Sequence, residues 1–351
     1  MPAEQSVSPK MIVSGSPHIH GPESVSKIMW GVVIALLPAL AVSIYYFGLP
    51  ALRTVLVSTA TCVALEWLIQ RFLFKKPGSL QDGSAVITGL LLAFNLPATL
   101  PWWMTVIGAT AAIGLAKMAY GGLGNNPFNP ALVGRVFLLI SFPVAMTTWP
   151  QPQPMFGTAP AGQPAVEIGA ATELAADALT GPTPLGVIKE GLQQGLTIDE
   201  SLKSLGLSPV EMLTGQRAGS LGEVSVLAIL LGGLFLLWRR IITWHIPAAF
   251  LGSAFVFAAI LHAAAPQAFP PPGFSLLSGG IMLGAFFMAT DMVTSPMTPW
   301  GKIIFGLGCG LLTILIRNFG AYPEGVSFAI LIMNAFVPLI NRGFKPKRYG
   351  C

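Results

Sequence analysis

Residues 89–102 read GLLLAFNLPATLPW, an apolar run that prolines interrupt before it is long enough to cross a membrane. Residues 284–297, GAFFMATDMVTSPM, are a second short apolar run followed by a proline. A helix that crosses lipid needs about 20 apolar residues, and broken helices occur at membrane depth only where protein or a water-lined cavity surrounds them. The two stretches predict interrupted helices in the interior of a membrane protein, which are typical of ligand sites in transporter folds.

The composition indicates a polytopic integral membrane protein. Of the 351 residues, 53% are hydrophobic and 9% are charged, whereas soluble domains carry roughly 25% charged residues. The formal net charge of +5 is attributed to cytoplasmic loops. We find no basic patch interleaved with aromatics, so no nucleic-acid partner is expected. The spacing of the three cysteines fits no metal or redox motif.

Ten segments are candidate membrane-spanning helices of an all-α fold. Two of them, 84–97 and 275–290, are short and end in the broken sequences described above. The full set of candidates is 28–48, 51–74, 84–97, 102–120, 130–148, 223–243, 247–265, 275–290, 301–319 and 325–341.

Basic residues in the connecting segments predict the orientation. Lysine and arginine collect in cytoplasmic loops, and here they follow the second, sixth and last candidate helices. Both termini are therefore expected in the cytoplasm. The predicted parts are a cytoplasmic segment (1–27), a first five-helix half (28–148), an extracytoplasmic loop (149–222), a second five-helix half (223–341) and a cytoplasmic tail (342–351).

The two halves carry a weak internal repeat. The broken stretches align at an offset of 195 residues (284 − 89), which pairs Thr99 with Thr294 and Pro101 with Pro296. Further on, GNNP at Gly124 aligns with GAYP at Gly320 at an offset of 196 residues (320 − 124). Five helices separate the copies, so the repeats would be inverted and would place a site near the membrane midplane. Chance similarity of two apolar segments is the alternative.

The segment GGLGNNPFNPALVGR, residues 121–135, contains candidate ligand contacts. Asn129 and Pro130 have the character of a helix N-cap and first helical position. Asn126 and Asn129 offer amide donors and acceptors, and Arg135 could reach a phosphate. The alternative is an ordinary capped membrane helix with an arginine that only sets topology.

Ionisable residues inside apolar segments are a second group of candidates, because charges are costly in hydrocarbon. They are Glu66, Lys117, Asp291 and Arg317. Asp291 is the strongest, since it lies in the broken stretch. Lys117 and Arg317 lie near helix ends, where extension of the side chain toward the membrane surface is the simpler explanation. Asp82 resembles a helix N-cap.

The predicted loop contains DALTGPTPLG, residues 177–186. Its glycines and prolines predict a turn that presents the hydroxyls of Thr180 and Thr183. Two interpretations are open: an ordinary loop, or an acceptor site for a transferred group. The chain has no nucleophile elbow, no P-loop lysine and no paired acid–base motif, which argues against a hydrolase.

Several motifs in the same order resemble one family over nearly the whole chain. That family is the D subunits of the Rnf complex, a membrane ferredoxin–NAD⁺ oxidoreductase, to which the B subunits of the sodium-translocating NADH–quinone reductases are related. The motifs are SPHIHGPESVSKIMWGVVIALLPA from Ser16, DGSAVITGLLLAFNLP from Asp82, GGLGNNPFNPALVGRVF from Gly121, GSLGEVSVLAILLGG from Gly219 and FFMATDMVTSPMTPWGK from Phe286.

The resemblance implies a covalent flavin. In that family a flavin transferase links FMN through its phosphate to a threonine in a motif like Asp-x-x-[Ser/Thr]-Gly-Ala-[Ser/Thr]. Here the motif begins at Asp177, continues with Thr180 and Gly181, and ends at Thr183, with Pro182 in place of the usual alanine. Thr183 is therefore the expected FMN carrier, with Thr180 second.

The resemblance also implies further flavin contacts and a second, non-covalent riboflavin. Arg135 and the amides near Asn129 are expected at the FMN phosphate or ring, and we place riboflavin where Asp291 meets the broken helices. The residues expected to close over the FMN are Gly219, Ser220 and Glu223.

As a family member the chain would be one component of a complex in a bacterial inner membrane. Electrons would pass between ferredoxin and NAD⁺ through partners that include iron–sulfur membrane subunits and a second covalent-flavin subunit, and would drive Na⁺ or H⁺ outward. The chain has no Rossmann glycine pattern, so the NAD⁺ site is expected elsewhere. The alternatives are a non-redox solute channel, since the family fold resembles that of urea transporters, or a scaffold subunit.

Overall fold

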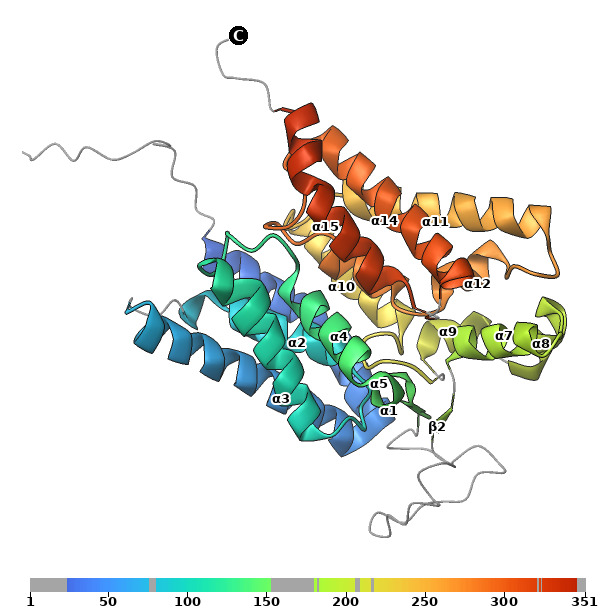
Figure 1. Ribbon diagram of the computed structural model, residues 1–351, viewed down its shortest axis with the longest axis horizontal. Coiled ribbons are helices and arrows are strands. Elements are labelled where there is room, and N and C mark those ends of the chain that lie inside the picture. The colour runs from blue at the N-terminus through green and yellow to red at the C-terminus, as the bar shows by residue number, and fades with distance from the viewer. Residues whose placement is uncertain are drawn as a thin grey trace, which may run out of the picture.

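The computed structural model describes residues 24–75, 80–152, 180–181, 183–205, 209–215, 218–320, 322 and 324–345. Two groups of helices lie next to each other (Figure 1). The first, blue to green, contains α1 to α5, and the second, yellow to red, contains α10 to α15. A smaller group, α7 to α9, joins them at one side.

The first helix is long enough for two membrane crossings. Helix α1 spans Val25–Leu68, and its Ser24 N-cap accepts a hydrogen bond from the Lys27 N–H at 3.2 Å. The segment is interrupted at Gly48, just before Pro50, where the φ of 60° and the ψ of −141° are not helical. It therefore consists of two helices that meet at a kink, and these correspond to the predicted spans 28–48 and 51–74. The π-helical turn η1, Ile69–Leu73, continues the second of them.

The rest of the first group surrounds the first interruption. Helix α2 ends at Phe94, and a turn leads from it through Pro97 to α3. Asn129 caps α4 by accepting from the N–H groups of Ala131 and Leu132, which confirms the predicted N-cap. The elements are η2 (Leu80–Asp82), α2 (Ser84–Phe94), α3 (Trp102–Thr110), η3 (Ala111–Lys117), η4 (Met118–Tyr120), α4 (Pro130–Ser141) and α5 (Pro143–Thr147).

The segment predicted as a long loop contains short elements in its described part. Strand β1 (Trp149–Pro150) pairs antiparallel with β2 (Thr180–Gly181). Three helices follow: α7 (Pro184–Gln193), α8 (Ile198–Leu205) and α9 (Pro209–Thr214). The N–H of Ile198 donates to the Gln267 carbonyl at 3.2 Å, so this group is attached to the second helical group.

The second group has an interruption of its own. Helices α12 and α13 are short, and the π-helical turn η5 ends at Met288. Two long helices follow it. The elements are α10 (Val226–Trp238), α11 (His245–Ala264), α12 (Pro272–Leu277), α13 (Ile281–Leu283), η5 (Gly284–Met288), α14 (Pro299–Phe319) and α15 (Val326–Gly343).

The fold is that of a multi-pass helical membrane protein. Among the described residues, five helices are long and apolar enough to cross a membrane, and three shorter apolar helices accompany them. Large apolar side chains such as Trp238, Leu231 and Leu339 are exposed. A surface of this kind suits lipid or a membrane partner rather than water.

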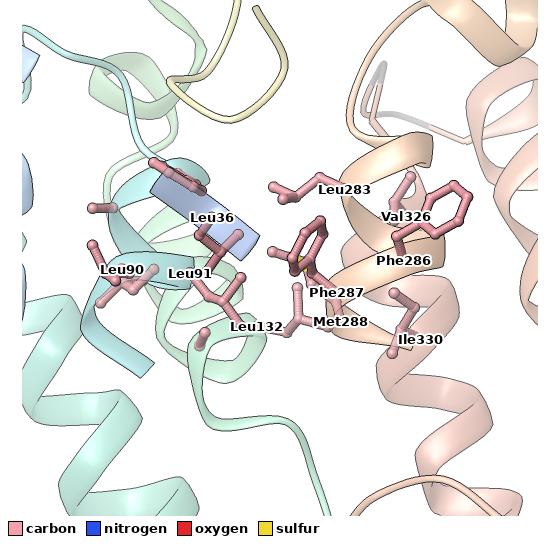
Figure 2. Packing of buried hydrophobic residues seen from close by; sticks show 14 of the residues in the cluster. Leu36, Leu90, Leu91, Leu132, Leu283, Phe286, Phe287, Met288, Val326 and Ile330 are labelled. Atoms are coloured by element: carbon pink, nitrogen blue, oxygen red, sulfur yellow. The ribbon is translucent and has the colours of Figure 1, made fainter. Parts of the chain in front are cut away.

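The two interruptions meet in the core. Figure 2 shows Phe287 and Met288 of η5 on the side facing Leu91 of α2 and Leu132 of α4. Asn95, directly after α2, donates to the Met288 sulfur at 3.7 Å. The protein interior thus encloses both interrupted helices, as the sequence predicts.

Corresponding elements keep the spacing of the repeated motifs. The N-caps of α4 and α15, Asn129 and Gly325, are 196 residues apart (325 − 129). The ends of α2 and η5, Phe94 and Met288, are 194 residues apart (288 − 94). Both values lie within two residues of the sequence offsets.

Candidate functional site

The Thr183 hydroxyl caps helix α7. Thr183 has extended backbone angles (φ −63°, ψ 159°), and its Oγ1 accepts from the Gly186 N–H at 3.1 Å. Pro184 occupies the first helical position, where its missing N–H costs nothing. Thr183 is only 5% exposed. The expectation of a hydroxyl displayed on a surface turn is therefore wrong, because capping draws this side chain into the fold.

The residues before Thr183 lie against the start of the same loop. Thr180 pairs with Pro150 and Gly181 with Trp149 in the short sheet. Of the motif residues, Thr180 and Gly181 are thus in a strand rather than a turn, and Asp177 lies outside the described residues.

The first turn of α7 packs on the second helical group. A Cβ added at Gly279, where φ is 65°, would lie 3.1 Å from Leu185 Cδ1 and 2.5 Å from the Arg317 guanidinium. Arg317 itself donates to the carbonyls of Ser275 and Ser278 at 2.8 and 3.1 Å. Its side chain is buried, so the explanation that it extends to the membrane surface is wrong: backbone carbonyls bind it inside the protein.

Glu223 lies beside Gly280, next to the glycine on which the first turn of α7 packs. A Cβ at Gly280 would lie 2.9 Å from one Glu223 carboxylate oxygen, and a Cβ at Gly219 3.4 Å from the other. Ser220 and Ser278 each bury a hydroxyl that has no hydrogen-bond partner among the described residues. Of the residues expected to close over FMN, Gly219 and Glu223 are in contact distance of each other, close to α7.

Arg135 has partners within the protein. It donates to Asn95 Oδ1 at 2.7 Å and forms a buried ion pair with Glu324. Glu223 is a second carboxylate within its electrostatic reach. Because two carboxylates surround one guanidinium, a phosphate at Arg135 would also meet negative charge. Its contact with FMN stays a prediction.

A half-open cavity lies beside the interrupted helices. Its empty volume is about 760 Å³ when the open solvent at its mouth is included. Three predicted site residues, Asn126, Asn129 and Asp291, line its wall. The remaining lining residues are Ile28, Met29, Val32, Ser84, Ile87, Thr88, Leu91, Lys117, Leu123, Pro130, Ala131, Leu236, Ile241, Ile242, Phe287, Thr290, Met292 and Val293.

The polar groups of this wall are held in fixed positions. Asn129 Nδ2 donates to the Met288 carbonyl at 3.2 Å, which links α4 to η5. Asn126 Nδ2 donates to the Phe128 carbonyl at 3.1 Å, while its buried Oδ1 has no partner among the described residues. The Asp291 carboxylate accepts from the Val293 N–H and the Thr294 hydroxyl at 3.3 and 3.1 Å. Apolar walls with a few fixed polar groups suit a flat organic ligand.

Lys117 is a cavity residue that sequence reasoning does not place at the site. Its ammonium contacts Glu66 at 2.6 Å, and both side chains are 1% exposed. Extension of Lys117 to the membrane surface is therefore the wrong explanation. The available signal is the presence of two opposite charges in apolar segments, since buried charges require a partner.

Asp82 is close to its predicted role. The N-cap of α2 is Gly83, one residue later. Asp82 Oδ1 nevertheless accepts from the Ser84 N–H at 2.8 Å and from the Ser84 hydroxyl at 2.7 Å. The carboxylate thus binds the first turn of the helix without occupying the cap position.

Comparison with known proteins identifies the family. Residues 12–350 match the model of the NQR2, RnfD, RnfE family. The chain is 46% identical over 330 residues to the D subunit of the ion-translocating oxidoreductase complex of Stutzerimonas stutzeri, covering 93% of this chain and 92% of the relative. It is 43% identical over 342 residues to the D subunit of the Na⁺-translocating ferredoxin:NAD⁺ oxidoreductase complex of Acetobacterium woodii, covering 97% and 95%.

A third relative carries a different ion in its name. The D subunit of the proton-translocating ferredoxin:NAD⁺ oxidoreductase complex of Clostridium ljungdahlii is 41% identical over 338 residues, covering 96% of each chain. These matches extend over nearly all of the sequence, including both interrupted helices and the α7 segment. The chain belongs to the NQR2, RnfD, RnfE family.

Proposed function

We propose that this chain is the flavin-carrying membrane subunit of an Rnf-type complex. It would relay electrons between ferredoxin and NAD⁺ through FMN bound covalently to Thr183 and through riboflavin bound in the cavity. The names of the relatives support the complex and the reaction. The observation that carries the flavin assignment is the position of Thr183, at the end of the acceptor-like motif and at the N-terminus of a helix docked on the membrane bundle.

The local geometry suits a phosphoester. Thr183 Oγ1 already lies 3.1 Å from the Gly186 N–H, at the positive end of the α7 dipole. A phosphate attached to this oxygen would lie at the N-terminal end of α7, where the helix dipole favours negative charge. The buried hydroxyls of Ser220 and Ser278 are further candidate partners for the flavin.

Because Thr183 is buried, attachment requires the hydroxyl to be accessible at some stage. A flavin transferase would therefore act before α7 packs, or when it opens locally. The tethered FMN would then lie at the N-terminal end of α7, beside the turn that contains Gly279 and Gly280.

We propose that the cavity holds a second flavin without a covalent bond. Its apolar side chains would pack on the rings, and Asn126, Asn129 and Asp291 would bind polar ring edges. A bound flavin supplies one- and two-electron transfer chemistry, while the protein supplies position, electrostatics and exclusion of water.

The proposed topology has ten crossings in two inverted halves, a urea-transporter-like arrangement. The 194- and 196-residue spacings of corresponding helix ends support the repeat. Both termini would face the cytoplasm and α7 the opposite side of a bacterial inner membrane. Partners would include iron–sulfur membrane subunits and a second covalent-flavin subunit, and the coupling ion would be Na⁺ or H⁺.

A non-redox solute channel is the second candidate. The half-open cavity between interrupted helices favours it, because broken helices also line solute sites. A channel, however, has no need of an acceptor motif at Thr183.

A denaturing gel tests the proposed function. The chain is expressed with a flavin transferase, and the gel is illuminated with ultraviolet light for the wild type, Thr183→Ala and Thr180→Ala. We expect a fluorescent band that only Thr183→Ala loses, with the FMN mass increment on the peptide 177–186. A dark wild-type band without that increment would favour the channel.

A further inference from the structure

A chain of hydrogen bonds leads from the cavity wall toward the end of α2. Lys117 Nζ donates to the Ser84 hydroxyl at 2.7 Å, and that hydroxyl donates to Asp82 Oδ1 at 2.7 Å. Lys117 and Ser84 both line the cavity, whereas Asp82 is only partly buried and follows the exposed Gln81. The three side chains, here called the Lys117 relay, therefore connect a buried ammonium with the protein surface.

The position of Lys117 in its helix is a second argument that this residue has a functional role. It is the last residue of the π-helical turn η3, and such turns occur frequently at functional sites. The turn brings the ammonium to the cavity wall and to Glu66 on α1. An ion pair buried only for stability gains little over apolar packing, whereas a polar wall has a use if the ligand exchanges charge or protons.

We propose that Lys117 exchanges a proton with the flavin in the cavity, and that Ser84 and Asp82 connect it with water. This rests on the proposed function, which supplies the flavin and, through partner subunits, the electrons. During reduction Lys117 would give one proton to the reduced flavin and become a neutral amine. Asp82, which accepts from Ser84 in the structure, would take one proton from water and give it to the Ser84 oxygen, and Ser84 would give its own hydroxyl proton to the amine.

The reverse sequence follows the hydrogen bonds as the structure has them. On oxidation the Lys117 ammonium gives one proton to Ser84, which gives its own hydroxyl proton to the Asp82 carboxylate, and Asp82 releases that proton to water. The amine formed in this way then takes the proton that leaves the flavin. Each step moves one proton, and the electrons leave through the redox partners.

Other ionisable groups around Lys117 set its charge balance. Glu66 and Cys62 approach it from α1, and Asp291 reaches it electrostatically from beyond η5. Glu66 also accepts from Gln70 Nε2 at 3.1 Å, so its position is fixed. Its carboxylate compensates the ammonium but offers no hydrogen-bonded path to Asp82 among the described residues, which makes Ser84 the connecting group.

The test uses full-length Thr183→Ala protein purified with its non-covalent flavin, so that only the cavity flavin titrates. Flavin released on denaturation is first quantified. The flavin is then photoreduced in weakly buffered solution, while its absorbance and a pH-indicator dye are followed. Ser84→Ala cuts the relay but leaves the Lys117–Glu66 pair intact, and Asp82→Asn removes the terminal acceptor.

We expect proton uptake to slow at least about tenfold in Ser84→Ala and in Asp82→Asn, with flavin content unchanged. The matched control is Ser58→Ala, which removes another buried serine hydroxyl that donates to α2, at Gly89 O and 2.8 Å; it should take up protons at the parent rate. Parent rates in both relay variants, with flavin bound, would overturn the relay alone. A parent protein without releasable flavin would overturn both the relay and the cavity cofactor, but not the FMN at Thr183.

Discussion

The α7 region and the cavity region hold their polar groups in different ways. Thr183 lies at a helix end that is attached by a two-residue strand pair, by Lys189 donating to the Gly320 carbonyl, and by a few apolar contacts. The cavity is enclosed by interrupted helices that buried hydrogen bonds and an ion pair connect. A site on a lightly attached element cannot retain a cofactor by enclosing it, so it needs a different means of retention. In the proposed function a covalent bond does this for FMN, and enclosure does it for riboflavin.

The largest loss of stability is expected from a variant in the cavity region. Lys117→Met leaves the Glu66 carboxylate buried without its cation, which should lower the free energy of unfolding by about 3–5 kcal/mol. The double variant Lys117→Met/Glu66→Gln should recover most of that loss, because no unpaired charge is left. Thermal unfolding in detergent measures both. If the single and double variants lose the same stability, the pair is not the cause.

A second variant acts where the segment before α10 packs on the two interrupted helices. Gly222 donates its N–H to the Phe94 carbonyl at 2.8 Å, and a Cβ there would lie 2.7 Å from Phe94 Cβ and from Leu283 Cδ2. Gly222→Ala should therefore cost about 1–3 kcal/mol through overpacking. Gly252→Ala is the control, since a Cβ there meets nothing within 4 Å. Equal melting temperatures for the two variants would contradict the close packing at Gly222.

The α7 region should respond to loss of its cap more than the cavity does. Thr183→Ala removes the N-cap acceptor, worth about 1 kcal/mol, and should increase hydrogen exchange of the first α7 turn. Thr183→Ser retains the oxygen and should behave like the wild type. Protection in the cavity helices should not change in either variant. An equal loss of protection in both regions would show that they are one cooperative unit.

The smallest effect concerns α8. The Glu200 carboxylate accepts from the Thr197 N–H and hydroxyl, both at 2.8 Å, and these hydrogen bonds lower the pKa of Glu200. The carboxylate therefore stabilises the folded α8 at pH values above its unfolded-state pKa of about 4.3. This stabilisation is lost as pH falls through the lower folded-state pKa. Amide exchange in α8 should therefore rise below about pH 4. In Glu200→Gln this pH dependence should be absent, and its persistence would point to another group.

The sequence predicts the helices well, because hydropathy and capping are local properties. The candidate span 301–319 corresponds to α14, which begins two residues earlier since Thr298 caps it and Pro299 fills its first position. Asn129 is likewise predictable as a cap from its own neighbourhood. The two helices predicted within α1 are confirmed, because the backbone is not helical at Gly48, where they meet at a kink.

The side-chain environments could not be predicted to the same extent. The burial of Lys117 depends on Glu66, 51 residues earlier, and on Ser84, which are brought together only by tertiary packing. The burial of Thr183 depends on α7, a helix within a segment expected to be a loop. The placement of Asn126, Asn129 and Asp291 on one cavity follows in part from the broken helices, since inverted interruptions meet in the interior.

The central claim is that the two regions hold two separate flavins, and acid precipitation of the purified protein tests it most directly. The pellet retains covalent flavin, and the supernatant contains released flavin. The account predicts one flavin of each kind per chain in the wild type, loss of only the pellet flavin in Thr183→Ala, and loss of only the released flavin in Ile87→Trp, which fills the cavity. Pellet flavin that survives Thr183→Ala, or released flavin that survives Ile87→Trp, would contradict it.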